Sequence, residues 1–89
     1  MTSERWQTFT KSQQMLFIGS ELQRAEVWQG KDDGKFRGAL ERGLTLLDLS
    51  LDDPQWHDSL PMLLGLREKM AEFYINMDVQ NIGVLYAAL

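Results

Sequence analysis

The 89-residue chain contains no cysteine, so neither a disulfide framework nor a thiolate metal site can form in it. This absence excludes the disulfide-rich class of small secreted domains. Proline is also scarce: Pro54 and Pro61 lie close together, and the rest of the chain is free of the strongest helix breaker. Stretches in which polar and β-branched residues alternate, as in a strand, are missing. We therefore examine the spacing of the apolar residues for the period of a helix.

No apolar run in the sequence approaches the ~20 residues that a membrane-spanning helix needs. Positive charge is sparse as well: the net charge is −4, and the basic residues are spread from Arg5 to Lys69 without forming a stripe. An acidic chain repels phosphate backbones and anionic lipids, so we expect neither a nucleic acid nor a membrane as a partner. Residues 1–11 are polar and carry both charge signs, unlike a signal peptide, which predicts a cytoplasmic location.

Apolar material, by contrast, is plentiful: hydrophobic residues make up 44% of the chain and include three Trp and five Met. We expect one domain that spans residues 1–89. A domain of this size buries only about 60% of the surface of its unfolded chain. It therefore needs either a core of large side chains or a second chain that covers part of its apolar surface.

The first predicted helix covers residues 3–29. Its regular part starts near Thr10, because Thr10 and Gln13 fit a capping box. Leu16 and Phe17 lie beside the predicted core stripe and widen it. Gly30 is the predicted stop, and residues 31–34 form a turn. The core stripe follows steps of three and four residues: Met15, Ile18, Leu22 and Ala25.

The second predicted helix starts at an N-cap, Asp33, and carries the clearest apolar stripe of the chain. Gly38 and Gly43 interrupt it at about 1 kcal/mol each relative to Ala, which indicates the close approach of a neighbouring helix. Asp53 and Pro54 open a short turn, and a third helix begins near residue 59 or 60. The two stripes are Phe36, Leu40, Leu44, Leu47 and Leu51 in the second helix, and Leu63, Leu66, Met70, Phe73 and Met77 in the third.

Residues 79–89 carry no charge, and we predict a short helix there, capped by Asp78, with a strand over residues 82–86 as the alternative. An end this apolar should be buried in its own bundle or against another subunit. The short connections favour antiparallel neighbours. The predicted fold is therefore all-α: an up-down antiparallel bundle of three main helices plus a short C-terminal fourth.

The chain contains parts of several ligand-binding and catalytic motifs, but none of these motifs is complete. Gly30 and Gly34 each precede a lysine, as in a phosphate loop, but Asp32 and Phe36 stand where the hydroxyl belongs, and two aspartates would repel a phosphate. Residues 48–59 imitate a calcium loop but place Ser59 at its closing position. His57, the single histidine, has no Glu three residues before it, and no nucleophile elbow exists. We predict no enzyme, no cofactor and no metal site, with a metal or nucleotide binder around His57 as a distant alternative.

The three tryptophans, Trp6, Trp28 and Trp56, each lie near a predicted helix end. Tryptophan is over-represented at interaction hot spots. Ordinary packing at the ends of the bundle is the other interpretation, and the sequence leaves both open.

A family resemblance covers most of the chain. Residues 39–52 look like the second long helix of the flagellin-export chaperone family, and residues 63–78 resemble the next helix of that family. Residues 21–33, a helix that runs into a Gly-Lys-Asp-Asp turn, are similar in layout. The resemblance implies a cytoplasmic four-helix bundle that holds an aggregation-prone helical partner in hydrophobic grooves until export.

The sequence therefore favours a non-enzymatic helical interaction module, such as a chaperone or adaptor, that receives an apolar helix of a protein partner. The alternative is a structural homodimer whose surplus apolar face is covered by a second copy. Leu46 and Leu49 lie off the main stripe of their helix and call for a second apolar neighbour. The predicted contact residues are Phe17, Trp28, Leu46, Leu49 and Tyr86.

Overall fold

The computed structural model describes residues 1–76, 80–87 and 89, and these residues form helices and no strand. The fold is the predicted all-α bundle, and in place of the alternative strand over residues 82–86 the structure has a turn at residue 82 followed by helix. The elements are α1 (Ser3–Trp6), α2 (Lys11–Trp28), α3 (Asp33–Leu51), the 3₁₀ segment η1 (Pro54–Ser59), α4 (Leu60–Tyr74) and α5 (Gly83–Ala87).

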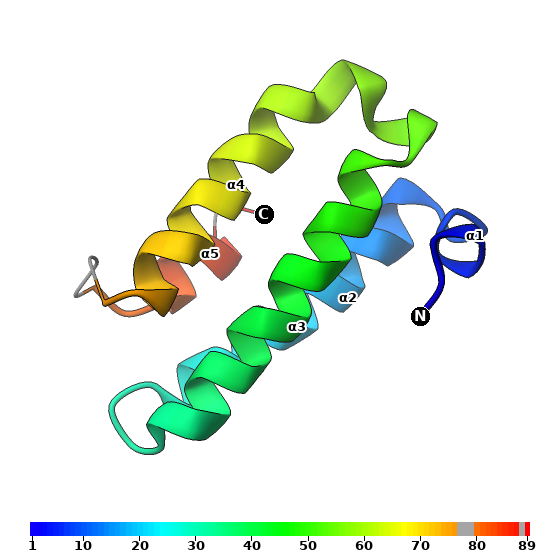
Figure 1. The fold of residues 1–89 in the computed structure, drawn as a ribbon. Coiled ribbons are helices and arrows are strands. Elements are labelled where there is room, and N and C mark those ends of the chain that lie inside the picture. The colour runs from blue at the N-terminus through cyan, green and yellow to red at the C-terminus, as the bar shows by residue number, and fades with distance from the viewer. Residues whose placement is uncertain (77–79, 88) are drawn as a thin grey trace.

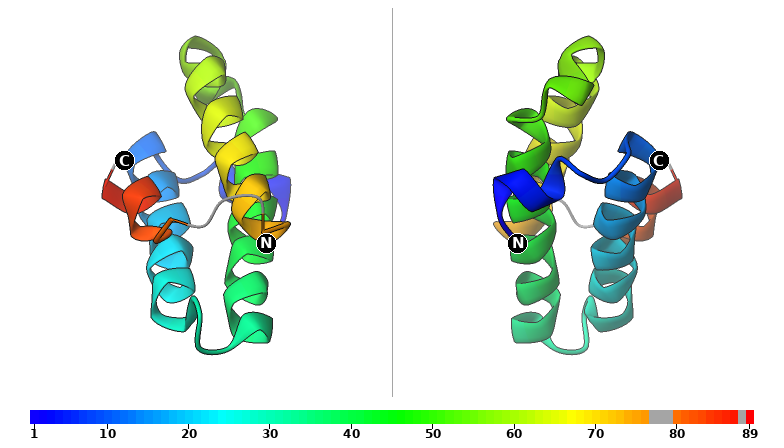
Figure 2. Two further views of the ribbon diagram at one scale, coloured as in Figure 1. Left: turned by 90° about the vertical axis from the view of Figure 1, so that its left-hand side faces the viewer. Right: turned by 90° about the vertical axis from the view of Figure 1, so that its right-hand side faces the viewer.

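The helix α3 is the centre of the bundle (Figure 1). It packs against α2 on one side and against α4 on the other, and it runs antiparallel to both. The short helix α5 lies against α2, while α1 lies on the opposite side of α3 from α4 (Figures 1 and 2). None of the helices in the described part of the chain is both long and apolar enough to cross a bilayer.

The helix boundaries follow from local capping. The predicted capping box of α2 is present, with Thr10 and Gln13 each accepting a backbone N–H of the other. Asp53 caps η1, and Pro54 is the first residue of η1, as expected. The predicted N-cap of α3 was wrong by one residue. Asp32 has the extended backbone of a cap and accepts the N–H of Lys35 at 3.0 Å, so Asp33 is already helical.

The apolar stripes predict the buried faces of the helices, with a shift in α3. There the buried face runs through Ala39, Gly43 and Ser50. These small residues let α3 contact two neighbours at once. As a result, Met15, Leu44, Leu51 and Leu66 are half-buried rather than central, while Met77 and Asp78 lie outside the described residues. The buried core consists of Trp6, Ile18, Leu22, Ala25, Phe36, Ala39, Leu40, Leu47, Trp56, Leu63, Met70, Phe73, Ile82 and Leu85.

Of the two glycines inside α3, one explains how closely α3 and α4 approach each other. A Cβ atom on Gly43 would lie 2.6 Å from Cε of Met70, so the absence of a side chain makes room for α4. The close approach predicted at Gly43 is therefore confirmed. A Cβ atom on Gly38 would meet a side chain of its own helix, Arg42, at an ordinary distance of 3.5 Å. Gly38 faces no neighbouring helix, and that part of the prediction was wrong.

A buried network of hydrogen bonds connects α1 and η1 to the α2–α3 pair, at the end where α2 begins and α3 ends. Its centre is the fully buried Gln14, whose side-chain oxygen accepts from the indole N–H of Trp56 (2.6 Å) and from Ser50 Oγ (3.1 Å). The Gln14 amide donates to Asp53 Oδ2 at 2.7 Å, and the indole N–H of Trp6 donates to Ser50 Oγ at 3.0 Å. Two of the three tryptophans therefore have a packing role.

The carboxylate of Asp53 is nearly buried within this network. Burial alone raises the pKa of Asp53, but hydrogen bonds from Gln14 and from Gln55 stabilise the anion more strongly. The pKa of Asp53 is therefore lowered from its ordinary value of 3.8.

Candidate functional site: the groove between α2 and α3

The side of the α2–α3 pair that faces away from α4 and α5 is largely uncovered. Seen from this side, α1 crosses its upper end, and no other helix lies over the remainder (Figure 2, right). Two adjoining hollows of about 520 and 470 Å³ follow this side of the pair and share Arg42. We call them together the α2–α3 groove. Its lining side chains are Phe17, Glu21, Arg24 and Trp28 from α2, Lys35, Glu41, Arg42, Thr45 and Leu46 from α3, and Met1 at the N-terminus.

The groove follows from helical spacing. The lining positions on each helix recur every three or four residues, which places them on one face. Phe17 and Trp28 mark its two ends on α2, eleven residues apart, which corresponds to roughly 16 Å or three helical turns at 1.5 Å per residue. An amphipathic segment of about three turns therefore matches the groove in length.

The upper half of the groove contains its apolar side chains, which rest on a rigid aromatic base, and is also lined by the carboxylates of Glu21 and Glu41. We call it the apolar half. The ring of Phe17 is 43% exposed, and its centroid lies 5.1 Å from that of Phe9 and 5.8 Å from that of the buried Trp6. Leu46 and the exposed Met1 border the same hollow. Because contacts with two other rings hold Phe17, this surface is ordered before any ligand arrives.

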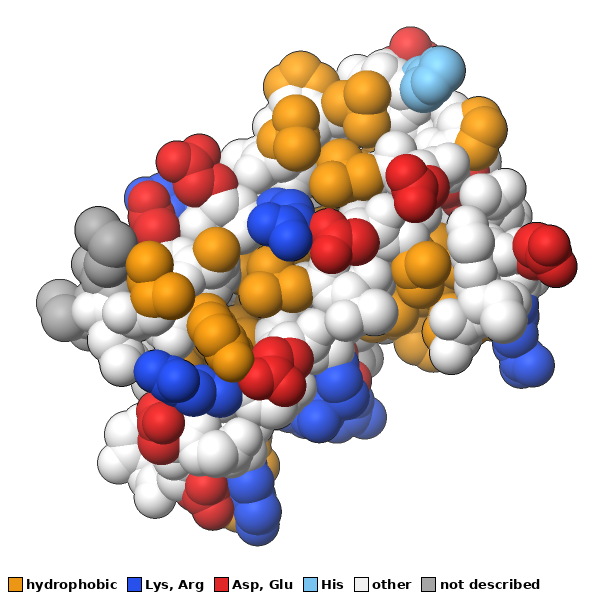
Figure 3. All heavy atoms as spheres, in the orientation of Figure 1, with side chains coloured by type: hydrophobic (Ala, Val, Ile, Leu, Met, Phe, Trp, Pro, Cys, Tyr) orange, Lys and Arg blue, Asp and Glu red, His pale blue; other side chains and the backbone are white. Residues whose placement is uncertain are grey.

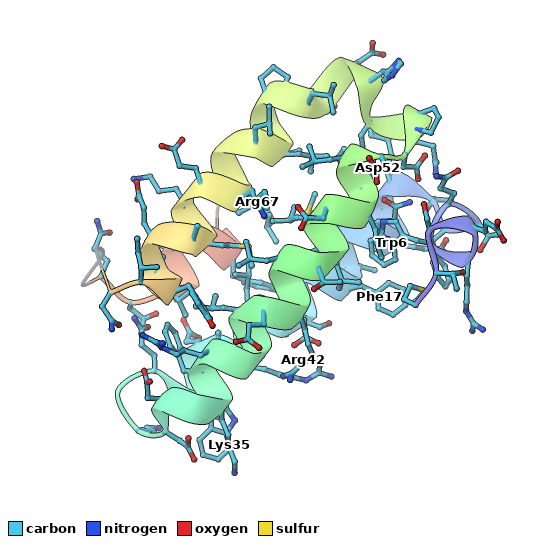
Figure 4. The ribbon with its side chains drawn as sticks, in the orientation of Figure 1. Trp6, Phe17, Lys35, Arg42, Asp52 and Arg67 are labelled. Carbon is cyan, nitrogen blue, oxygen red and sulfur yellow. The ribbon has the colours of Figure 1, made fainter. Side chains whose placement is uncertain are left out.

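The lower half of the groove is cationic. One nearly buried carboxylate, Glu21, accepts from Arg24 Nη1 at 2.5 Å and from Arg42 Nε at 3.0 Å. Lys35 Nζ lies 4.1 Å from the ring centroid of the half-buried Trp28. Figure 4 shows Arg42 and Lys35 toward the lower end of α3, with Phe17 higher up, close to α1. Two of the three cations thus pair with one carboxylate, and the third lies over the Trp28 ring.

Two glycines shape this cationic half. Gly34 and Gly38 line the same hollow as Trp28, and they leave the backbone of α3 bare there. Larger side chains at these two positions would occupy part of the space beside Trp28. The glycines that interrupt the apolar stripe of α3 therefore have different structural roles, since Gly43 admits α4 whereas Gly38 keeps the groove open.

Three of the five predicted contact residues line the groove. Phe17 and Leu46 lie in its apolar half, and Trp28 lies in its cationic half. The other two lie elsewhere. Leu49 is half-buried against the core, and Tyr86 is on α5. The arginines and Lys35 were not predicted, because apolar stripes contain no information about charged contact residues. Their spacing from Phe17 and Leu46 along each helix was the available signal.

Tyr86 belongs to a second, smaller surface that we call the α2–α5 strip, formed by Met15, Leu16, Tyr86 and Leu89. Its most exposed member is Leu16, at 71%. A Cβ atom on Gly19 would lie 3.2 Å from the Tyr86 ring, so the bare backbone of α2 lets α5 approach at this point.

The opposite face, formed by α3 and α4, is closed by polar bridges. Arg67 Nε lies 2.7 Å from Asp48 Oδ1, and the Tyr74 hydroxyl donates to Glu41 at 2.6 Å. The hydrogen bond to the Glu41 carboxylate raises the pKa of Tyr74. On this face, apolar side chains are interspersed with acidic and basic ones (Figure 3). It therefore lacks the separation into an apolar and a cationic half that distinguishes the α2–α3 groove.

The residues considered for metal or nucleotide chemistry lie apart from the groove or have structural contacts. His57 is exposed in η1, and the Asp32 carboxylate caps α3. Within the described ranges, no three His, Asp or Glu side chains come together in a way that could hold a metal ion.

Comparison of the chain with known proteins returned no matching family, and neither a curated protein nor a solved structure matches it significantly. The resemblance to flagellin-export chaperones stays a prediction from the sequence. The α2–α3 groove is thus the observation that bears most directly on function.

Proposed function

We propose that the chain is a non-enzymatic protein-interaction module, of the adaptor or chaperone kind, that binds an amphipathic helix of a partner protein in the α2–α3 groove. The supporting observation is the pair Phe17 and Leu46, which lines a three-turn groove between two helices. A partner helix lying there would pack its apolar face on both α2 and α3, which is the helix-in-groove mode of recognition.

The composition of the groove supports this proposal. Aromatic residues and arginine are enriched at the centres of protein interfaces, and aromatic anchors often dominate the binding energy. Phe17, Trp28 and Arg42 are residues of this kind on one surface. The aromatic contacts of Phe17 lower the entropy that is lost when a ligand orders it. With no cysteine to require an oxidising compartment, the cytoplasm is the location we propose.

The proposal is tested with a synthetic amphipathic peptide of about 18 residues, long enough to overhang three turns, with leucines at helical spacing on one face. We expect saturable binding by fluorescence anisotropy. Phe17→Ser and Thr45→Glu should each weaken binding at least about tenfold, or ~1.4 kcal/mol. Thr45 is exposed, so this second variant adds a charge to the apolar half without removing a core side chain.

The matched control is Leu64→Ser, which removes an exposed leucine of α4 that is 54% accessible and lies outside the groove. This variant should bind the peptide as the unchanged protein does. Circular dichroism and thermal melting of each variant verify that the bundle is intact. If the unchanged protein does not bind the peptide, or if Leu64→Ser weakens binding as much as Phe17→Ser does, the proposed function is wrong.

A homodimer is the second candidate, and the α2–α5 strip is the observation that favours it. Leu16 is highly exposed there, and neither Ser12 nor any other lining side chain of the strip is charged. Such a surface can meet its own copy without charge repulsion. Light scattering over a concentration series should then show a dimer that Leu16→Glu converts to a monomer. A monomer at all concentrations contradicts this second candidate.

A further inference from the structure

We infer that the partner helix is acidic at one end: its carboxylates lie against Arg24, Lys35 and Arg42, and its apolar side chains lie against Phe17 and Leu46. This inference rests on the proposed function, and it specifies the chemistry and the direction of the ligand.

The first supporting observation is the ion-pair arrangement around Glu21. One carboxylate holds two guanidiniums, through Nη1 of Arg24 and through Nε of Arg42. The arginine side chains remain 59% and 58% exposed and line the hollow. A guanidinium carries five N–H donors, so each retains donors for a second carboxylate. Because Glu21 already orders both arginines, a ligand loses less side-chain entropy on binding them.

The second observation is the charge balance. The chain as a whole has a net charge of −4, so an acidic ligand is repelled by the molecule as a whole. The hollow at the lower end of the groove is lined by three cations, Arg24, Lys35 and Arg42, and by no carboxylate, whereas Glu21 and Glu41 line the upper hollow. A segment with acidic residues at one end is therefore attracted to this end alone, which fixes its direction.

The acidic side chains closest in sequence to this end have other contacts. Asp32 caps α3 through the N–H of Lys35, and Asp33 lies 3.3 Å from Arg37 Nε. Glu41, which lines the upper hollow, accepts the hydroxyl of Tyr74. Among the described residues, Arg24 and Arg42 thus have Glu21 as their ion-pair partner, while Lys35 contacts the ring of Trp28.

The third observation is the register. Arg42 lies one turn below Leu46 on α3, and Lys35 lies about three turns below it, or roughly 16 Å. Carboxylates spaced by one to three turns from the apolar anchors of the ligand would therefore reach the cations. A peptide with leucines along its whole face and glutamates in its second half meets this geometry.

The experiment compares two peptides of about 18 residues with the same leucine face. One carries glutamates in its second half and the other carries lysines at the same positions. Binding is followed by tryptophan emission, because Trp28 is half-buried in the groove while Trp6 and Trp56 are buried in the core. We expect the glutamate peptide to bind at least about tenfold more tightly. This ratio should fall toward one in about 0.5 M salt, where charges are screened within a few ångström.

Substitutions of the groove cations test whether the preference for the glutamate peptide arises in the groove. Lys35→Gln and Arg24→Gln should each reduce the ratio at least about threefold, whereas Arg5→Gln, the same loss of charge on α1, should leave it unchanged. Arg24→Gln leaves Arg42 as a partner for Glu21, and Lys35→Gln breaks no ion pair among the described residues. If Arg24→Gln unfolds the bundle, Lys35→Gln and the salt dependence still test the inference about charge.

The outcomes separate the two proposals. Equal affinity for both peptides, with binding that still depends on Phe17, overturns the inference about charge and leaves the proposed function standing. Failure of both peptides to bind overturns both. Inorganic phosphate at about 10 mM is the last comparison: if it abolishes the preference at an ionic strength where sodium chloride does not, the cations form a general anion site and the inference is wrong.

Discussion

The centroid of the Phe17 ring lies 5.8 Å from that of Trp6, and these two rings join the surface of the groove to the buried core. Phe17 is 43% exposed, whereas Trp6 is fully buried and donates its indole N–H to Ser50. The apolar end of the groove is therefore supported by the polar network around Gln14. Changes in that network should affect the bundle as a whole, whereas changes at Phe17 should mainly affect binding.

Replacing Gln14 by leucine removes the centre of this network. The buried indole N–H of Trp56 then loses its acceptor, and Asp53 loses a donor. Unsatisfied buried polar groups are unfavourable by about 1–3 kcal/mol each, so we expect the free energy of unfolding to fall by about 2–4 kcal/mol. Urea unfolding measures this change. Gln23→Leu, at an exposed position of the same helix, should stay within about 0.5 kcal/mol, and an equally small effect of Gln14→Leu would contradict the assigned role.

The lowered pKa of Asp53 predicts a pH dependence of stability. A carboxylate whose pKa is lower in the folded state stabilises the fold above its ordinary pKa of 3.8, and this contribution is lost as the pH falls through the folded value. Stability should therefore fall below about pH 4, and Asp53→Asn should show a smaller fall. Urea melts at about pH 6 and pH 3 test this expectation. The same fall in both proteins would mean that Asp53 does not contribute to it.

Two glycine substitutions should change stability in opposite directions. Gly65 lies within α4, and a Cβ atom there would meet nothing within 4 Å, so Gly65→Ala should stabilise the protein by up to about 1 kcal/mol through helix propensity. Gly43→Val would press against the buried Met70 and should destabilise the protein by about 1–3 kcal/mol. Thermal melting compares the two. A stabilising Gly43→Val would show that α3 and α4 do not approach closely there.

The attachment of α5 depends on the side chain of Gln29. Its amide donates to the carbonyl of Gln80 at 2.8 Å, and its oxygen accepts the N–H of Ile82 at 2.7 Å. Gln29→Ala should weaken this attachment by about 1 kcal/mol and leave α2 and α3 intact. Hydrogen exchange should speed up at Ile82 and Leu85 without a change at core amides of α3. Gln23→Ala is the control, and unchanged exchange at both residues would contradict the role of Gln29.

Much of the fold could be predicted because local patterns determine it. The capping box at Thr10 and the Asp53–Pro54 pair set helix starts that depend on neighbouring residues alone. The position of Asp32 as the cap depends on the backbone conformation of the turn, which two adjacent aspartates do not distinguish. The half-burial of Leu44 depends on where α2 and α4 meet α3, and an apolar stripe on one helix does not contain this information.

Part of the candidate site could also be predicted, because local sequence patterns single out some of its residues. Leu46 lies off the main stripe of its helix, Phe17 lies beside the stripe of its own helix, and Trp28 lies near a helix end, so local patterns single out all three. The cationic half depends on Glu21 and Arg42, which are 21 positions apart and meet only when α2 and α3 pair. Leu49 lies on the same helix as Leu46 but packs against the core, a difference that comes from the tertiary contacts.

The most direct test of the groove is a proton–nitrogen spectrum of the three tryptophan indoles during titration with the glutamate peptide. The indoles of Trp6 and Trp56 are hydrogen-bonded within the buried network, whereas Trp28 lines the groove. Binding in the groove should move the Trp28 signal progressively to saturation and leave the other two nearly in place. A peptide that binds without moving the Trp28 signal would contradict the account, because its site would then lie elsewhere on the bundle.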